Sequence, residues 1–116
     1  MEKKPYNPIE LMASVASRYI EDGRLIFAGT GIPMLAASLA KKIHCPNLVL
    51  VYEAGGISPE ASMLPLSVAD SRTTYRAICS ASMPEAFEML QKGVVTYAFL
   101  GGAQIDRYGN LNSTVI

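Results

Sequence analysis

The residue best placed to do chemistry in this sequence is Glu53, which directly follows an apolar stretch at 48–52. Gly55 and Gly56 come almost at once after it. A carboxylate at a strand end beside residues without side chains can be reached by an activated acyl group, toward which it can act as a nucleophile. We therefore predict that Glu53 is catalytic. The competing interpretation is a strand-end glutamate that makes an ordinary ion pair or cap.

The same pattern of an apolar strand followed by glycine occurs twice more. Residues 24–28 lead into Gly29-Thr30-Gly31, and residues 94–100 lead into Gly101-Gly102. Six of the nine glycines thus lie just past predicted strands, and Glu53 supplies the single charge among these three strand ends. If the strands are parallel, all three glycine pairs meet at one edge of the sheet, where open α/β folds bind their ligands.

Helices must separate these strands. Asn7, Pro8 and Glu10 form a helix-start pattern, and the predicted helix runs to Asp22 before Gly23. A second helix is predicted over 33–43 and a third from the capping box Ser82-Met83-Pro84-Glu85 to Gly93. We expect an apolar stripe of the first helix to pack on the core, made of Ile9, Met12, Ala16, Tyr19 and Ile20. In the third helix we expect Phe87, Met89 and Leu90 to face inward.

The region from 58 to 80 has poor periodicity, so we predict loops, a helical turn near 67–70 and a strand at 75–79. The alternation of continuous apolar strands with helices indicates an α/β fold, an open and mainly parallel sheet with helices on both faces. The length of 116 residues, half of them hydrophobic, predicts a single domain over 1–116.

Composition excludes several classes of function. Ten basic and ten acidic residues cancel, and no basic run exceeds two residues, so we expect no nucleic-acid or membrane-surface partner. The start of the chain lacks an apolar signal core and no apolar run could span a membrane, which predicts a cytoplasmic protein. Cys45, Cys79 and His44 cannot complete a zinc site. We predict no metal, a helix-end role for His44, and packing roles for both cysteines.

A dinucleotide site is an alternative reading of the first turn. Gly29-Thr30-Gly31 follows a strand, and Glu53 ends the next strand at the spacing of a ribose-binding acid. The third glycine position is occupied by Met34 after Pro33, which breaks the part of the pattern that lets helix and strand pack closely. The sequence therefore favours the carboxylate nucleophile over the dinucleotide site.

The last segment of the chain resembles part of a known protein family. Residues 100–114, Leu-Gly-Gly-Ala-Gln-Ile-Asp-Arg-Tyr-Gly-Asn-Leu-Asn-Ser-Thr, resemble a segment of the β subunits of family I CoA-transferases, closest to the glutaconate CoA-transferase B-subunit type. Gly29-Thr30-Gly31-Ile32-Pro33 resembles the family's Gly-x-Gly-Ile/Leu-Pro turn, and Glu53-Ala54-Gly55 its Glu-x-Gly motif. The resemblance extends over nearly the whole chain, from about Asn7 to Ile116.

The resemblance implies that Glu53 attacks an acyl-CoA, giving an acyl-glutamyl anhydride and then a glutamyl-CoA thioester that passes CoA to a second carboxylic acid. Coenzyme A thioester would be a substrate, with no permanently bound cofactor. The glycine turns could offer backbone N–H groups to CoA or to an oxyanion. The predicted CoA- and substrate-binding residues are therefore Gly29, Gly31, Gly55, Gly101, Gly102 and Gln104. For the segment from Asp106 to Asn110, a tight turn is favoured over substrate contact, with Gly109 at positive φ and Asp106 and Asn110 bonded to the backbone.

The chain also departs from the family. Family β subunits continue well past the Asn-Ser-Thr segment, so this sequence resembles their N-terminal half. We expect either a truncated chain, a fragment of a longer protein, or a naturally short relative. The resemblance further implies an α-type partner subunit and a homo- or hetero-oligomer. A non-catalytic binding or assembly module of the same fold and a CoA-thioester hydrolase remain alternatives, although Glu53 favours transfer over hydrolysis.

Overall fold

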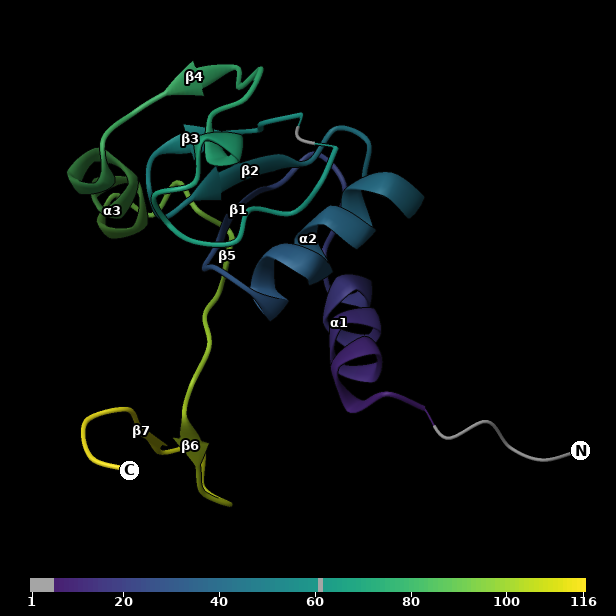
Figure 1. The fold of residues 1–116 in the computed structure, drawn as a ribbon, viewed down its shortest axis with the longest axis vertical. Coiled ribbons are helices and arrows are strands. Elements are labelled where there is room, and N and C mark those ends of the chain that lie inside the picture. Colours follow the sequence, from purple (N-terminus) through teal and green to yellow (C-terminus); the bar gives the residue numbers. More distant parts are fainter. Residues whose placement is uncertain (1–5, 61) are drawn as a thin grey trace, which may run out of the picture.

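The computed structural model describes residues 6–60 and 62–116. Its elements are α1 (Pro8–Arg18), β1 (Leu25–Ala28), α2 (Ile32–Ile43), β2 (Val49–Tyr52), β3 (Gly56–Ile57), a 3-10 turn η1 (Ser71–Thr73), β4 (Cys79–Ser80), α3 (Met83–Gln91), β5 (Tyr97–Phe99), β6 (Gln104–Ile105) and β7 (Leu111–Asn112). Strands and helices alternate through the first half of the chain, as predicted (Figure 1).

The main sheet has the strand order β4-β3-β2-β1-β5. The central strand β1 pairs in parallel with β2 on one side and with β5 on the other. The short strands β3 and β4 extend the sheet in antiparallel orientation beyond β2. The prediction of an open, mainly parallel sheet is confirmed. The antiparallel pairing of β3 and β4 was not predicted, because each of these strands has only two residues.

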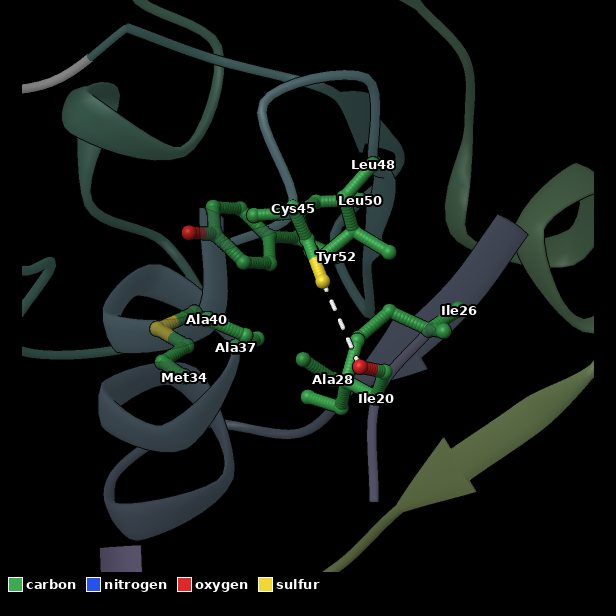
Figure 2. Close-up of a cluster of buried hydrophobic side chains, with 10 residues drawn as sticks. All are labelled: Ile20, Ile26, Ala28, Met34, Ala37, Ala40, Cys45, Leu48, Leu50 and Tyr52. Carbon is green, nitrogen blue, oxygen red and sulfur yellow. Dashed lines mark hydrogen bonds between the residues drawn. The ribbon is translucent and has the colours of Figure 1, made fainter. Parts of the chain in front are cut away.

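Helices cover both faces of the sheet, with α1 and α2 on one side and α3 on the other (Figure 1). Alternate strand residues serve the two faces: Ile26 and Ala28 pack toward α2, whereas Phe27 of the same strand packs toward α3. Figure 2 shows the first of these clusters, in which the side chains of β1 and β2 meet Met34, Ala37 and Ala40 of α2. A strand buried on both faces explains why its sequence lacks polar alternation.

The helix starts follow the predicted capping. Asn7 Oδ1 accepts a hydrogen bond from the Ile9 N–H at 3.0 Å, and Ser82 with Glu85 forms a reciprocal capping box. Gly93, at φ +71°, ends the turn after α3, and His44 is the C-terminal cap of α2, as predicted. Helix α1 ends at Arg18 rather than Asp22, because Tyr19 and Ile20 donate to carbonyls three residues back in a tightened last turn.

The expected core stripe of α1 is wrong. Ile20 is buried, but Ile9, Met12 and Tyr19 are 49%, 55% and 71% exposed. The buried residues of α1 are instead the small Ala13 and Ser17, which allow close approach to α2. In α3, Met89 and Leu90 pack on the core as expected, whereas Phe87 is 41% exposed although its ring lies 5.6 Å from that of Phe27.

The region from 58 to 80 agrees with its prediction in part. The predicted turn forms at 67–70, where the Asp70 N–H donates to the Ser67 carbonyl at 3.2 Å. A 3-10 turn at 71–73, which was not predicted, follows it, with Asp70 as its N-cap accepting from the Arg72 N–H. The predicted strand at 75–79 is reduced to Cys79–Ser80. Positive backbone φ at Arg76 turns the chain just before it.

The predicted strand at 94–100 is shorter, covering only β5, and an arm leaves the sheet beyond it. This arm carries the β6–β7 hairpin, which projects away from the sheet (Figure 1). The predicted turn forms the hairpin loop: Gly109 has φ +87°, and Asp106 Oδ1 accepts from the N–H groups of Tyr108 and Asn110. The side-chain amide of Asn110, which was expected to bond the backbone, donates instead to the Asp106 carboxylate.

The two cysteines differ sharply in environment. Cys45 is buried and its thiol donates to the Ile20 carbonyl at 3.3 Å, while Cys79 is exposed (Figure 2 shows Cys45). Burial raises the pKa of the Cys45 thiol, which keeps it protonated and unreactive.

We expect a disulfide reagent to modify the exposed Cys79 quickly in the native chain and the buried Cys45 only after unfolding. Cys79→Ser should abolish the fast phase, and two equally fast thiols would contradict this burial.

Candidate active site at the carboxyl edge of the sheet

Strand register gathers the predicted site residues at one edge. Ala28 of β1 is aligned with Tyr52 of β2 and with Phe99 of β5. Each strand end is therefore level with the others, so Gly29, Glu53 and Leu100 follow at the same edge. The Gly29 N–H donates to the Phe99 carbonyl at 2.9 Å, which holds two of these ends together.

Glu53 is half-buried where β2 ends and the chain turns. Across residues 6–60 and 62–116, no side-chain cation lies within 4.0 Å of its carboxylate. The ion-pair interpretation of Glu53 therefore has no partner in this part of the chain. A carboxylate partly withdrawn from water and not neutralised by a cation keeps its lone pairs available for attack on an electrophile.

Gly55 and Gly56 are buried, and the space left by their missing side chains is filled by backbone. A Cβ on Gly55 would lie 2.0 Å from the Ala81 carbonyl oxygen, and one on Gly56 would lie 1.7 Å from the Thr73 carbonyl oxygen. These glycines thus let distant segments approach the loop after Glu53, and the Ala81 N–H donates to the Gly55 carbonyl at 2.9 Å. The expectation that they clear space for a substrate is replaced by this packing role.

The first glycine turn separates into two roles. The Gly29 N–H donates to a carbonyl within the sheet. Contrary to the prediction, it is therefore not available to a ligand. Gly31 is exposed and caps α2 at φ +94°, a conformation that favours glycine. Met34 is fully buried between α2 and the sheet, so a large side chain fills the place where a dinucleotide fold needs its third glycine.

Gly101, Gly102 and Gln104 lie on the arm. Gly101 continues from the strand-end edge, whereas Gly102 already contacts the hairpin, since a Cβ there would lie 3.0 Å from a Leu111 methyl. Gln104 accepts a hydrogen bond from the Asn112 amide at 2.7 Å within the hairpin, which projects away from the sheet (Figure 1). A role in ligand binding stays a prediction for these three residues.

Sequence reasoning missed Thr30 and Tyr52. Thr30 stands between the two glycines of the first turn, and its hydroxyl oxygen is buried with no hydrogen-bond partner within the described ranges. Such a group is uncommon in a folded protein and calls for a partner. Tyr52 immediately precedes Glu53 and is buried against α2, and burial raises the pKa of its phenol. Thr30 holds the variable position of the Gly-x-Gly turn and Tyr52 lies in the apolar strand before Glu53, so neither residue marks chemistry by its type alone.

Among residues 6–60 and 62–116, no group of three or more His, Cys, Asp or Glu side chains is arranged to hold a metal ion. Within the same part of the chain, the helices are too short or too polar to cross a bilayer.

Comparison with known proteins decides the family. The model of the coenzyme A transferase family matches residues 9–116, which is nearly the whole chain. This chain belongs to the coenzyme A transferase family. The family resemblance inferred from the Gly-Thr-Gly turn, Glu53 and the 100–114 segment is thereby confirmed.

The chain is similar to family members of known activity. It is 40% identical to the B subunit of the 3-oxoadipate CoA-transferase of Pseudomonas knackmussii, with 96% of this chain and 43% of that protein covered. The structure of glutaconate CoA-transferase from Acidaminococcus fermentans matches at a TM-score of 0.81 and 31% identity, covering 99% of this chain and 46% of that one. The chain thus spans less than half the length of these relatives.

A protein with a different activity shares the same coenzyme A transferase fold. The decarboxylase AibA/AibB matches at a TM-score of 0.79 and 27% identity over 93% of this chain and 46% of its own. The fold therefore accommodates more than one reaction, and the reaction must be argued from the side chains of the site.

Proposed function

We propose that this chain carries the catalytic glutamate of a CoA-transferase, with Glu53 as the nucleophile and an α-type subunit as partner. The observation that carries the proposal is the half-buried Glu53 carboxylate, without a neighbouring cation in the described ranges, at the edge where three parallel strands end. The 3-oxoadipate CoA-transferase relative supports the partner, because it is the B subunit of its enzyme and a B subunit implies at least one other.

The proposed reaction proceeds in balanced steps. A Glu53 oxygen attacks the thioester carbonyl carbon of acyl-CoA, and the C–S bond breaks to release CoA thiolate and leave a mixed anhydride. The thiolate then attacks the Glu53 carboxyl carbon, which expels the first carboxylic acid as its carboxylate and leaves glutamyl-CoA. A second carboxylate reverses both steps and leaves with CoA, so the reaction is ping-pong and needs no redox partner.

The glutamyl-CoA thioester can be trapped directly. We would incubate the chain, together with its proposed α-type partner, with an acyl-CoA and no acceptor acid, and then analyse the peptides by mass spectrometry. CoA should be attached to the peptide that contains Glu53, and borohydride should convert that glutamate to an alcohol. An active complex in which Glu53 stays unmodified would rule out the covalent mechanism.

Thr30 is proposed to donate to a substrate oxygen at this edge. Because its hydroxyl has no partner in the described part of the chain, Thr30→Val should leave the free energy of unfolding unchanged or raise it. The same change should lower kcat/KM by about 10- to 100-fold if the hydroxyl bonds a charge that develops in the reaction. Thr30→Ser, which retains the hydroxyl, should keep most of the activity. Equal activity of both variants would remove Thr30 from the site.

A second candidate, a non-catalytic assembly module, is favoured by the exposed apolar face of α1. Leu11, Met12 and Val15 are exposed there at 44% or more, and side chains of this kind are typical of protein contacts. Turnover distinguishes the two functions. A module would support the same turnover with glutamine in place of Glu53, whereas a catalytic subunit would not.

A further inference from the structure

Ser58 is a buried serine at the base of the hairpin that carries Glu53. Strands β2 and β3 form this hairpin (Figure 1), with Val51 opposite Ile57 in antiparallel register. The next pair away from the turn therefore consists of Leu50 and Ser58. Each of these two residues is only 2% exposed. A polar side chain thus lies inside the fold, close along the chain to the proposed nucleophile.

The Ser58 hydroxyl takes the place of a backbone carbonyl between these strands. In a regular antiparallel ladder, the residues of a hydrogen-bonded pair exchange N–H···O=C bonds in both directions. The Ser58 N–H donates to the Leu50 carbonyl at 2.6 Å, as such a pair requires. The Leu50 N–H, however, donates to the Ser58 Oγ at 3.0 Å. One of the two bonds of this pair is therefore made by a side chain.

The backbone of Ser58 accounts for this exchange. Its φ is +48°, in the left-handed region that residues with a side chain seldom adopt. The chain therefore leaves the extended strand geometry at Ser58, and the hydroxyl supplies the acceptor that the buried Leu50 N–H needs. Backbone strain of this kind persists only where the surrounding structure maintains it, and it is concentrated at functional sites.

The same hairpin holds the turn in which Glu53 lies. The Gly55 N–H donates to the Tyr52 carbonyl at 2.8 Å, which closes a four-residue turn with Glu53 as its second residue. The pair of Leu50 and Ser58 joins the two arms at the other end of this short hairpin. Loss of the hydroxyl would release one bond there, so the arms and the carboxylate that they carry would be held less firmly.

We propose that Ser58 is a positioning residue for CoA transfer, whose hydroxyl holds the turn that presents Glu53. The inference rests on the proposed function of Glu53. Because Ser58 is buried and bonds the backbone of β2, it acts through the strand rather than on the substrate. Displacement of a reacting group by about 1 Å can cost about 100-fold in rate. The effect of Ser58 therefore belongs in kcat.

Two variants separate the hydroxyl from the strained backbone. Ser58→Ala removes the hydroxyl and keeps the strain, whereas Ser58→Gly removes the hydroxyl and relieves the strain. In the complex with the proposed α-type partner, both should lower kcat and the rate of glutamyl-CoA formation by about 10- to 100-fold. The value of kcat/KM for acyl-CoA should fall by the same factor, which leaves KM unchanged.

The matched control is Gly23→Ala. Gly23 precedes β1 at the edge opposite Glu53 and has φ +71° with open space around it, so the variant strains the backbone away from the site. It should unfold at a lower urea concentration and keep the kcat of the unmodified chain. Full kcat in Ser58→Gly would assign the effect to backbone strain and overturn the proposal. An equal loss of kcat in Gly23→Ala would reduce it to stability and also overturn it.

Hydrogen exchange of the chain itself tests the turn without a reaction. In Ser58→Gly the amides of Leu50 and Gly55 should exchange about 10-fold faster than in the unmodified chain. The amide of Gly29, which donates to the Phe99 carbonyl, is the internal reference and should keep its rate. Faster exchange at Leu50 alone would show that the hydroxyl supports its strand but not the turn, which would overturn the positioning role.

The positioning role and the nucleophile fail separately. An active, unmodified complex that forms no adduct on Glu53 would contradict the proposed function, whatever the exchange rates show for the turn. An adduct that forms as fast in Ser58→Gly as in the unmodified chain would overturn the positioning role alone.

Discussion

Glu53→Gln is expected to lower kcat of the assembled enzyme by about 10³-fold or more, as removal of a covalent nucleophile does. Glutamine has nearly the same shape, so packing at the end of β2 should be preserved while the anionic oxygen that attacks the thioester is lost. No described cation faces Glu53, so the substitution leaves no described charge unpaired. Turnover is measured by the transfer of CoA from an acyl-CoA to a carboxylate.

The control for this variant is Glu88→Gln. Glu88 is an exposed glutamate of α3 whose carboxylate pairs with Lys92 at 2.8 Å, and its loss removes the same charge from another surface. Its kcat should match that of the unmodified chain. Glu53→Asp, which keeps the charge but shortens the side chain, should be intermediate because the carboxylate no longer reaches its place. Turnover by Glu53→Gln close to that of Glu88→Gln would exclude the nucleophile.

Gly55→Ala should produce the largest loss of stability among the glycine variants, about 3–5 kcal/mol. Two costs add at this position. Its φ of +102° is one that residues with a side chain rarely adopt, and the new Cβ would lie 2.0 Å from the Ala81 carbonyl oxygen. Since the total stability of a small domain is about 5–15 kcal/mol, this loss would be plain in a urea unfolding curve.

Two other glycines separate the costs. Gly23→Ala meets open space at φ +71°, so it should cost only the conformational strain, about 1–2 kcal/mol. Gly101→Ala has open space and no positive φ, and its effect should stay within about 0.5 kcal/mol. If Gly55→Ala unfolds at the same urea concentration as Gly101→Ala, the close approach of the 81–82 backbone to this loop is wrong.

Local features were predictable because short-range chemistry determines them. Asn7 and Ser82 cap their helices since each side chain reaches a backbone N–H within three residues. The Gly109 turn forms for a similarly local reason, with Asp106 bonding the backbone beside it. The central strands are recognisable from their continuous apolar sequence, which both faces of the sheet then bury.

Burial along α1 could not be predicted in the same way. Its apolar spacing suits a core helix, yet the chain packs Ala13 and Ser17 inward and leaves Met12 exposed, because the contact with α2 selects small side chains. The strands β3 and β4 likewise form through pairing with a neighbour rather than through any propensity that two residues could express.

At the site, the sequence by itself determined that a lone carboxylate, Glu53, ends an apolar strand and that glycine turns end its neighbours, because residue type and order along the chain state this directly. The tertiary structure alone decided that these ends stand level, that the Thr30 hydroxyl lacks a partner in the described part of the chain, and that Gly55 and Gly56 accommodate the backbone at 81 and 73. Such approaches join segments far apart in the chain, so they depend on how the whole sheet and its helices pack rather than on local spacing.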